Sequence, residues 1–402
     1  MKIMQINCVY EEGSTGKITQ DIHHYLISRG VESLVYYGRG EKTEEPGVWK
    51  VCSEGYGKFQ NLLSRLTGVM YGGCFLSTLY ITARLRREKP DVVHLQCING
   101  YFVNIYRLIS WLKRWEIPTV LTLHAEFMYT ANCGYALDCE KWKTGCGHCP
   151  RLQQETCSLF LDGTADSHRR MKQAFRDFGR NLTVVSVSPW LKDRAKASPI
   201  LGEMEHRVIL NGLDTDIFTY QPSEKNKGEK IIFHATAFFT DDPAHIKGGF
   251  MVLELAKRLQ DLPVRFLVAG DYQLRGAVPE NVTLLGKIRD RKILARQYCR
   301  GDITLLTSKK ETFSMVCAES LCCGTPVVGF EAGAPEMVAL PQWSEFVPAG
   351  DLDALEQAVR RWLFKSVDKT KISREAARQY SLEAMAAQYL QIYRGMQYED
   401  PA

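Results

Sequence analysis

The sequence lacks the segments that would place it in a membrane or on a secretory route. None of its 402 residues fall in an apolar run of about 18 or more, the length that a membrane-spanning helix requires. The apolar start, residues 3–9, is not followed by the small-residue cleavage site of a signal peptide. We therefore expect a cytoplasmic protein, in which the thirteen cysteines are mostly reduced.

Repeats and a strong charge imbalance are also missing. No fixed-period repeat is visible, which excludes a solenoid. A net charge of +5 is too small to indicate nucleic-acid binding, so we expect no nucleic-acid partner. A chain of 402 residues is too long for one ordinary core, and two α/β domains are the natural expectation.

Basic and aromatic residues do gather in the first half of the chain. They are Arg84, Arg86, Arg87, Lys89, Arg107, Lys113, Arg114 and Trp115. An amphipathic helix resting on an anionic membrane has this composition, and so has a solvated helix face. The sequence leaves both interpretations open.

The first half alternates apolar strands with helices. Residues 3–9 are predicted as a strand, 11–16 as a tight loop and 17–29 as a helix, with further strands at 31–37, 91–96, 119–124 and 183–188. Continuous apolar strands of this kind are typical of a parallel sheet covered on both faces.

The same pattern restarts after Trp190. Strands are predicted at 230–235, 265–270, 282–285, 302–306 and 326–330, with a helix at 249–259 and a loop after residue 235. We expect an N-terminal domain of residues 1–205, completed by a final helix at about 381–402, and a C-terminal domain of residues 206–380. Both are expected to be Rossmann-like, doubly wound parallel-sheet domains.

The most informative segment is residues 301–328. A strand ends at about Thr307 and a helix begins near Ser314, so the helix offers unpaired N–H groups at the carboxyl edge of a sheet. The N–H groups of Ser314, Met315 and Val316 could hold a diphosphate. Glu319 would then accept hydrogen bonds from a ribose.

Glu311 precedes this helix and would lie where sugar hydroxyls are expected. Two glutamates with seven residues between them are weak evidence alone, because surface glutamates can have any spacing. The apolar strands before and after the segment make the pattern specific.

At these residues the sequence resembles the retaining glycosyltransferases of family 4 (glycosyl transferases group 1), which have the GT-B fold. Further matches are Gly13 and Gly16, His124, residues 211–218, Lys247 with Gly248, and residues 333–336. The cysteine-bearing residues 138–150 are most similar to the bacterial colanic acid and exopolysaccharide glycosyltransferases. The resemblance implies two Rossmann-like domains facing across a cleft, the first binding the acceptor and the second the donor.

The resemblance also implies a reaction. A hexose would pass from a UDP- or GDP-sugar to a saccharide acceptor that is expected to be lipid-linked, with retention of configuration and without a metal. The setting would be bacterial surface or exopolysaccharide biosynthesis, at the inner membrane face. Catalytic roles fall on His124, Lys247 and Glu311, and Lys247 would offset the charge of the departing diphosphate. The implied donor-binding residues are Gly13, Gly16, Gly286, Ile288, Phe313, Ser314, Met315, Val316 and Glu319.

Two positions depart from the family pattern. Residues 234–240 contain no arginine, although the family commonly has a glycine–arginine pair there. Lys247 then acts alone or with Lys17 or Arg289. Ala125 stands where an acidic residue is usual, and Glu126 follows it.

Cys133, Cys139, Cys146 and Cys149 have the spacing of four zinc ligands, and His148 lies among them. A structural zinc ion, with no open coordination position, and a loop of reduced thiols are both compatible with this pattern. Three other functions stay open at this point: a nucleotide-sugar 2-epimerase or a phosphorylase of the same fold, and a non-catalytic nucleotide-sugar scaffold.

Overall fold

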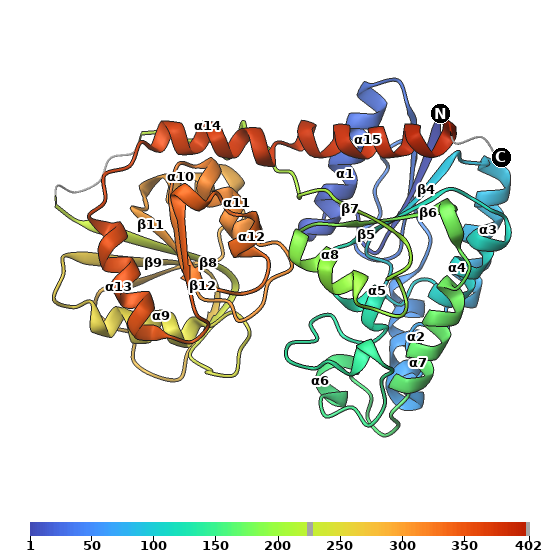
Figure 1. The fold of residues 1–402 in the computed structure, drawn as a ribbon, viewed down its shortest axis with the longest axis horizontal. Coiled ribbons are helices and arrows are strands. Elements are labelled where there is room, and N and C mark those ends of the chain that lie inside the picture. The colour runs from blue at the N-terminus through green and yellow to red at the C-terminus, as the bar shows by residue number, and fades with distance from the viewer. Residues whose placement is uncertain (223–227, 399–402) are drawn as a thin grey trace. The chain divides into compact units, whose positions relative to one another are not determined.

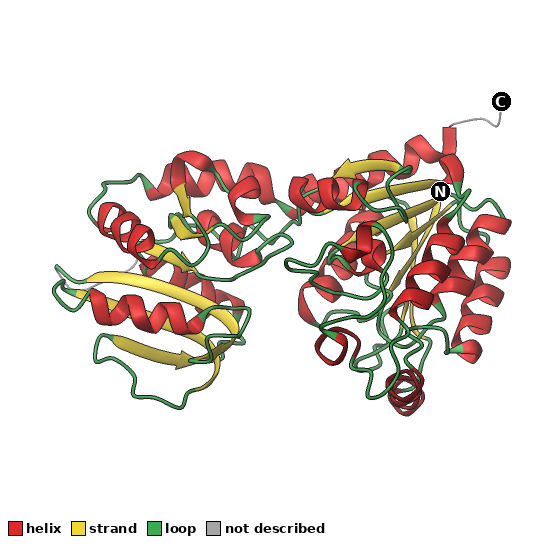
Figure 2. Ribbon diagram, turned by 60° about the horizontal axis from the view of Figure 1, so that its bottom comes forward, coloured by secondary structure: helices red, strands yellow, loops and turns green. Residues whose placement is uncertain are grey.

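The computed structural model describes residues 1–222 and 228–398, which form two compact units (Figure 1). The first unit comprises Met1–Ile209 and the C-terminal segment from Ala386 on, and the second comprises Leu210–Met385. The predicted boundary between residues 205 and 206 falls inside a strand of the first unit, β7 (Glu205–Val208). Each unit is a parallel sheet with helices on both faces (Figure 2), which confirms the predicted GT-B fold class.

The first unit contains a seven-stranded sheet of order β3-β2-β1-β4-β5-β6-β7. All its strand pairs are parallel. Its other strands are β1 (Lys2–Asn7), β2 (Glu32–Tyr37), β3 (Val48–Lys50), β4 (Val92–Leu95), β5 (Thr119–Leu123) and β6 (Leu182–Ser186). The strand order reverses between β1 and β4, which is where sheets of this type bind ligands at their carboxyl edge.

Helices cover both faces of this sheet. They are α1 (Gly13–Ser28), α2 (Glu54–Thr67), α3 (Phe75–Glu88), α4 (Ile105–Arg114), α5 (Phe127–Thr130), α6 (Leu152–Thr156), α7 (Thr164–Phe175), α8 (Pro189–Lys196) and most of α15 (Leu382–Tyr398), with short 3-10 turns at Lys141–Lys143 and Gly179–Asn181. Among residues 1–222 and 228–398, no helix is both long enough and apolar enough to span a bilayer.

The first helix begins earlier than the sequence predicts. Residues 13–16 were expected in a loop, but they form the first turn of α1. The Asn7 amide at the end of β1 donates to Val9 O at 2.8 Å and to Thr15 O at 3.2 Å, which draws the helix start close to the strand. A Cβ on Gly16 would lie 3.2 Å from the backbone at Tyr10 and Glu11, so glycine permits this close approach.

Helix α15 is joined to the first sheet by a buried hydrogen-bond network. Tyr393 Oη lies 2.7 Å from His94 Nδ1, and Tyr389 Oη lies 3.0 Å from Thr122 Oγ1. His94 Nε2 and Thr122 Oγ1 are 2.8 Å apart, which closes the network between β4 and β5. The C-terminal helix therefore supplies part of the core of the first unit.

The second unit contains a six-stranded parallel sheet of order β10-β9-β8-β11-β12-β13. The strands are β8 (Lys230–Thr240), β9 (Val264–Gln273), β10 (Val282–Gly286), β11 (Ile303–Leu306), β12 (Val327–Phe330) and β13 (Ser344–Val347). The helices are α9 (Gly249–Arg258), α10 (Arg291–Arg300), α11 (Met315–Cys322), α12 (Pro335–Val338), α13 (Leu352–Leu363) and α14 (Lys369–Tyr380), with a 3-10 turn at Pro341–Trp343. Val252, Phe266, Val328 and Leu355 lie in its core.

The prediction of a loop directly after residue 235 is wrong, because β8 continues to Thr240. Strand pairing between β8 and β9 shifts register between Ala235 and Phe238 and then resumes as far as Thr240 with Gln273. The bulge absorbs the interruption, so both strands run on beyond their predicted ends.

Candidate active site

The carboxyl end of β11 in the second unit brings Lys247 and Glu311 together. Lys247 Nζ lies 2.7 Å from Glu311 Oε1, and the two side chains are 30% and 12% exposed. Lys247 precedes α9 and is followed by Gly248, whose φ is +65°. A Cβ on Gly248 would lie 2.1 Å from Thr307 O, so the glycine lets the lysine segment pack against the β11 loop.

A second loop fixes the backbone of Glu311. Its N–H donates to Ala332 O at 2.9 Å, and Ala334 N–H donates to Glu311 O at 3.3 Å. The Glu336 carboxylate accepts from the N–H groups of Ala332 and Gly333, at 3.0 and 2.8 Å, and so holds this loop in shape. No role for Glu336 was predicted from the sequence, although a carboxylate three residues after Gly333 is suited to cap such a turn.

Helix α11 starts at the same edge of the sheet. Ser314 caps it, with the unusual φ of +81° for a residue that is not glycine, and its Oγ accepts from Cys317 N at 3.4 Å. Met315 and Val316 form the first turn and are half-buried. The first-turn N–H groups and the positive end of the helix dipole suit an anion such as a diphosphate.

Glu319 lies in the second turn of α11 and accepts a hydrogen bond from Tyr298 Oη at 2.9 Å. Burial raises the pKa of this carboxyl to about 7, while Tyr298 and the positive charge of Arg291 act in the opposite direction. A hydroxyl pair of a ribose could hydrogen-bond to this group. Tyr298 is not recognisable from the sequence as part of this site, because its contact with Glu319 joins α10 to α11.

The other predicted donor residues of this unit differ in accessibility. Gly286 ends β10 with a φ of +70° and has open space where a Cβ would lie, and Ile288 is half-buried two residues later. Phe313 is buried, with its ring 6.3 Å from that of Tyr380, so its side chain is a core residue. Arg289 is exposed.

In the first unit, His124 follows β5 and lies 3.2 Å, through Nε2, from Gln96 Oε1. Burial lowers the pKa of His124 to about 4, so its imidazole is neutral at pH 7. Gln96 in turn donates to Gln5 Oε1 at 2.8 Å, a support that the sequence analysis did not anticipate. Gly13 and Gly16 lie in the first turn of α1, and Lys17 pairs with Asp21 at 2.9 Å.

Glu126 has a structural role. Its buried carboxylate lies 2.6 Å from Arg194 Nε and accepts from Ala136 N–H at 2.7 Å. Because the Glu126 carboxylate is used in this way, it does not replace the acidic residue that the family usually has at the position of Ala125.

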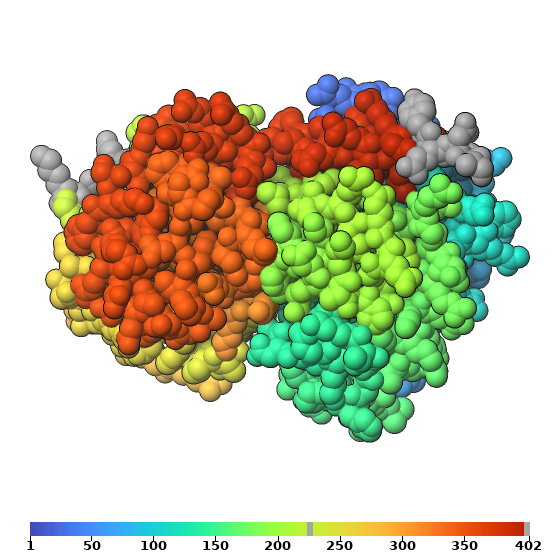
Figure 3. All heavy atoms as spheres, viewed as in Figure 1, coloured from blue at the N-terminus to red at the C-terminus, as the bar shows by residue number. Residues whose placement is uncertain are grey.

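The segment that bears Cys133, Cys139, Cys146 and Cys149 lies on the surface of the first unit, in the green-cyan region of Figure 3. Within the described residues, no three or more His, Cys, Asp and Glu side chains are grouped so as to hold a metal ion. Cys133 is buried and the other three cysteines are half-buried. The zinc site stays a prediction.

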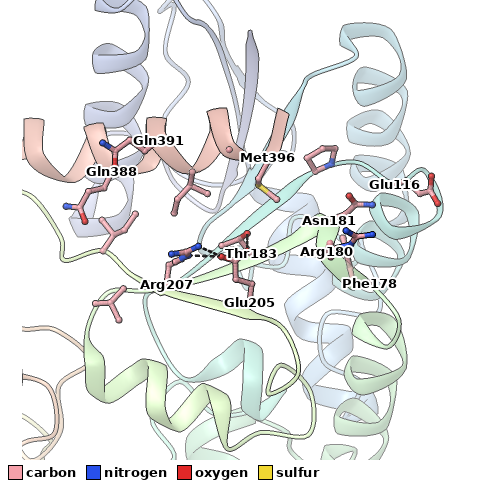
Figure 4. Close-up of a pocket in the computed structure, with 16 residues that line it drawn as sticks. Glu116, Phe178, Arg180, Asn181, Thr183, Glu205, Arg207, Gln388, Gln391 and Met396 are labelled. Carbon is pink, nitrogen blue, oxygen red and sulfur yellow. Dashed lines mark hydrogen bonds and ion pairs between the residues drawn. The ribbon is translucent and has the colours of Figure 1, made fainter. Parts of the chain in front are cut away.

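A cavity of about 870 Å³ opens at the amino ends of β5, β6 and β7, beside α15 (Figure 4). Arg207 Nη2 and Glu205 Oε1 pair at 2.6 Å in its wall, and Gln391 and Met396 line it from α15. His124 follows the carboxyl end of β5, so this cavity is not part of the candidate active site.

Comparison with known proteins agrees with this geometry. Residues 15–217 match the family described as Glycosyltransferase Family 4, and residues 232–364 match Glycosyl transferases group 1. The putative colanic acid biosynthesis glycosyl transferase WcaC of Escherichia coli K12 is 21% identical, over 98% of this chain and 100% of that protein.

Solved structures share the fold. A glycosyltransferase from Rickettsia africae superposes with a TM-score of 0.68 at 15% identity, over 99% of both chains. Anabaena Alr3699/HepE in complex with UDP-glucose superposes with a TM-score of 0.62 at 13% identity, over 98% of this chain and 100% of that one. The family match spans half of the chain, and the chain therefore belongs to Glycosyltransferase Family 4.

Proposed function

We propose that this glycosyltransferase moves a hexose from a UDP- or GDP-sugar to a saccharide acceptor, with retention of configuration and without a catalytic metal. The observation that carries the proposal is the pair of Lys247 and Glu311 beside the capped start of α11. The pair supplies a cation and an acceptor for sugar hydroxyls, and the helix start supplies N–H donors for a diphosphate.

The chemistry explains why these groups are needed. Breaking the bond to the anomeric carbon leaves positive charge on the sugar and adds negative charge to the departing diphosphate. Lys247 and the N–H groups of the first turn of α11 would stabilise that diphosphate. Glu311 would orient the sugar, Glu319 would bind the ribose, and the neutral His124 would hydrogen-bond to the donor sugar.

The names and bound ligands of similar proteins support a particular donor and a particular biosynthetic role. The HepE complexes contain UDP, glucose or UDP-glucose, which supports a uridine nucleotide donor. The name of the Escherichia coli relative supports a role in polysaccharide biosynthesis. We further propose a lipid-linked acceptor, used by a cytoplasmic enzyme at the inner membrane face.

The stereochemistry of the product tests the reaction. With a UDP- or GDP-sugar, a saccharide acceptor and excess EDTA, we expect transfer to proceed and proton NMR to show the anomeric configuration of the donor in the product. Inverted product, loss of activity in EDTA, phosphate-dependent cleavage or release of a sugar inverted at C2 would each contradict part of the proposal.

We also propose that the four-cysteine loop binds one structural zinc ion. The spacing of the cysteines and the glycine and proline residues around them support it. The thiols of this loop are not grouped closely enough in the described residues to hold a metal ion. Zinc binding would therefore require residues 139–149 to bring their thiols closer together. Protein purified under reducing conditions without chelator should contain about one equivalent of zinc. A zinc content near zero by elemental analysis would remove the proposal.

A further inference from the structure

Helix α2 of the first unit presents its apolar side chains to solvent. Phe59, Leu62, Leu63 and Leu66 recur at helical spacing and therefore lie on one face of the helix. Each is at least 37% exposed, whereas Ser64 on the other side is buried. An amphipathic helix packed in the usual way would bury the leucines and expose the serine.

Two neighbouring segments extend this surface. Further large apolar side chains with at least 40% exposure are Phe75, Leu76, Leu79 and Tyr80 on α3 and Leu159, Phe160 and Leu161 in the loop after α6. Together with the four residues of α2, these residues form what we call the apolar face. Exposed apolar patches of this kind usually mark an interaction site.

Hydrogen bonds show that the three segments are adjacent. Leu76 N–H donates to Tyr56 Oη at 3.4 Å, which joins α3 to α2. Leu159 N–H donates to Arg65 O at 2.8 Å, which joins the loop to the last turn of α2. The apolar face is therefore one continuous region of the first unit.

Its charged surroundings are basic. Helices α2 and α3 carry five basic residues, Lys58, Arg65, Arg84, Arg86 and Arg87, and two acidic ones, Glu54 and Glu88. Both acids are already paired: Glu54 with Arg39 at 2.8 Å and Lys50 at 3.0 Å, and Glu88 with Arg84 at 3.6 Å and Lys2 at 3.7 Å. The loop after α6 adds Asp162, whose carboxylate accepts hydrogen bonds from the N–H groups of Cys149 and Thr164. Arg107 lies over the ring of Phe75, 4.7 Å from its centroid.

We propose that the apolar face docks the first unit on an anionic lipid bilayer, with the leucines and phenylalanines in the interfacial region and the arginines at the headgroups. Helices that lie in the membrane interface typically combine phenylalanine and leucine on one face with arginine or lysine beside them. A second copy of the chain fits less well, because two faces of the same positive charge would repel each other. This inference rests on the proposed function, in which the acceptor is lipid-linked. Docking on the bilayer would bring the enzyme to that acceptor.

Vesicle flotation without detergent tests the docking. We expect the chain to float with vesicles of equimolar phosphatidylglycerol and phosphatidylcholine, and to float much less with phosphatidylcholine alone or at high salt. The combined variant Leu76→Ser, Leu79→Ser and Phe160→Ser should lower the bound fraction at least about tenfold. These side chains are 70%, 60% and 75% exposed, so folding should be retained.

A matched control removes exposed apolar side chains from the second unit. Phe364→Ser with Val278→Ser should float like the original chain. Failure of the original chain to bind the anionic vesicles, equal binding by the triple variant, or a lipid-independent dimer that the triple variant abolishes would overturn the inference. Stabilisation by nucleotides reports the donor site separately, and should be unchanged in the triple variant, so failure of the two proposals can be distinguished.

Discussion

Replacing Glu311 by glutamine should lower the rate of sugar transfer by about 10²- to 10³-fold, the loss typical when one preorganised group at a reacting centre is removed. The carboxylate holds Lys247 Nζ at 2.7 Å, and its backbone is fixed by the loop that ends at Glu336. Glutamine keeps the size of the side chain but loses the charge that positions the lysine and accepts sugar hydroxyls. Release of nucleoside diphosphate in the presence of acceptor measures the effect.

The fold should survive this change. Lys247 is 30% exposed and can be solvated when its partner loses its charge, so the free energy of unfolding should change by about 1 kcal/mol or less. Glu331→Gln is the matched control, since Glu331 is an exposed carboxylate on the loop that contacts Glu311. A Glu311→Gln enzyme with unchanged turnover would remove the assigned role.

Acid should destabilise the protein through buried histidines. Burial lowers the pKa of His94 to about 3 and the pKa values of His124 and His234 to about 4, whereas an unfolded histidine has a pKa near 6.5. Below pH 6.5 the unfolded chain binds protons that the folded chain does not. The free energy of unfolding should therefore fall as the pH falls from 6.5, until about pH 4 for His124 and His234 and about pH 3 for His94.

The three histidines together contribute a slope of about 4 kcal/mol per pH unit within that window. Glu319 acts in the opposite sense: its pKa is raised to about 7, so its contribution to stability grows as the pH falls from 7 toward 4.5. For these four groups together, a net slope of about 2.7 kcal/mol per pH unit is the expected result of urea unfolding between pH 6.5 and 4.5. His94→Gln should flatten this slope. Stability that is constant or rises on acidification would contradict this account.

Much of the fold was predictable from local patterns. The apolar strands of both units and the pairing of a strand end with a helix start at residues 307–314 are visible in the sequence, because each depends on residues close along the chain. The edge strands β3, β7 and β13 were not predicted. β3 has only three residues, β7 alternates exposed with half-buried positions, and β13 is half-buried at three of its four positions. None of the three strands therefore gives a continuous apolar signal.

The supporting residues of the site could not be read from the sequence. Gln96 contacts His124, and Tyr298 contacts Glu319, across 28 and 21 positions of the chain. Such contacts depend on which strands and helices become neighbours, which local patterns do not determine. The continuation of β8 to Thr240 was missed for the same reason, since pairing with β9 after the bulge decides it.

The central claim, that the chain binds a nucleotide sugar through the edge formed by Lys247, Glu311 and α11, is tested most directly by thermal unfolding in the presence of UDP, GDP, ADP and their common sugar conjugates. A ligand at about a hundred times its dissociation constant stabilises the folded state by about 2.7 kcal/mol. We predict that one nucleotide family, uridine or guanosine, raises the melting temperature selectively. No rise with any nucleotide or nucleotide sugar would contradict the account.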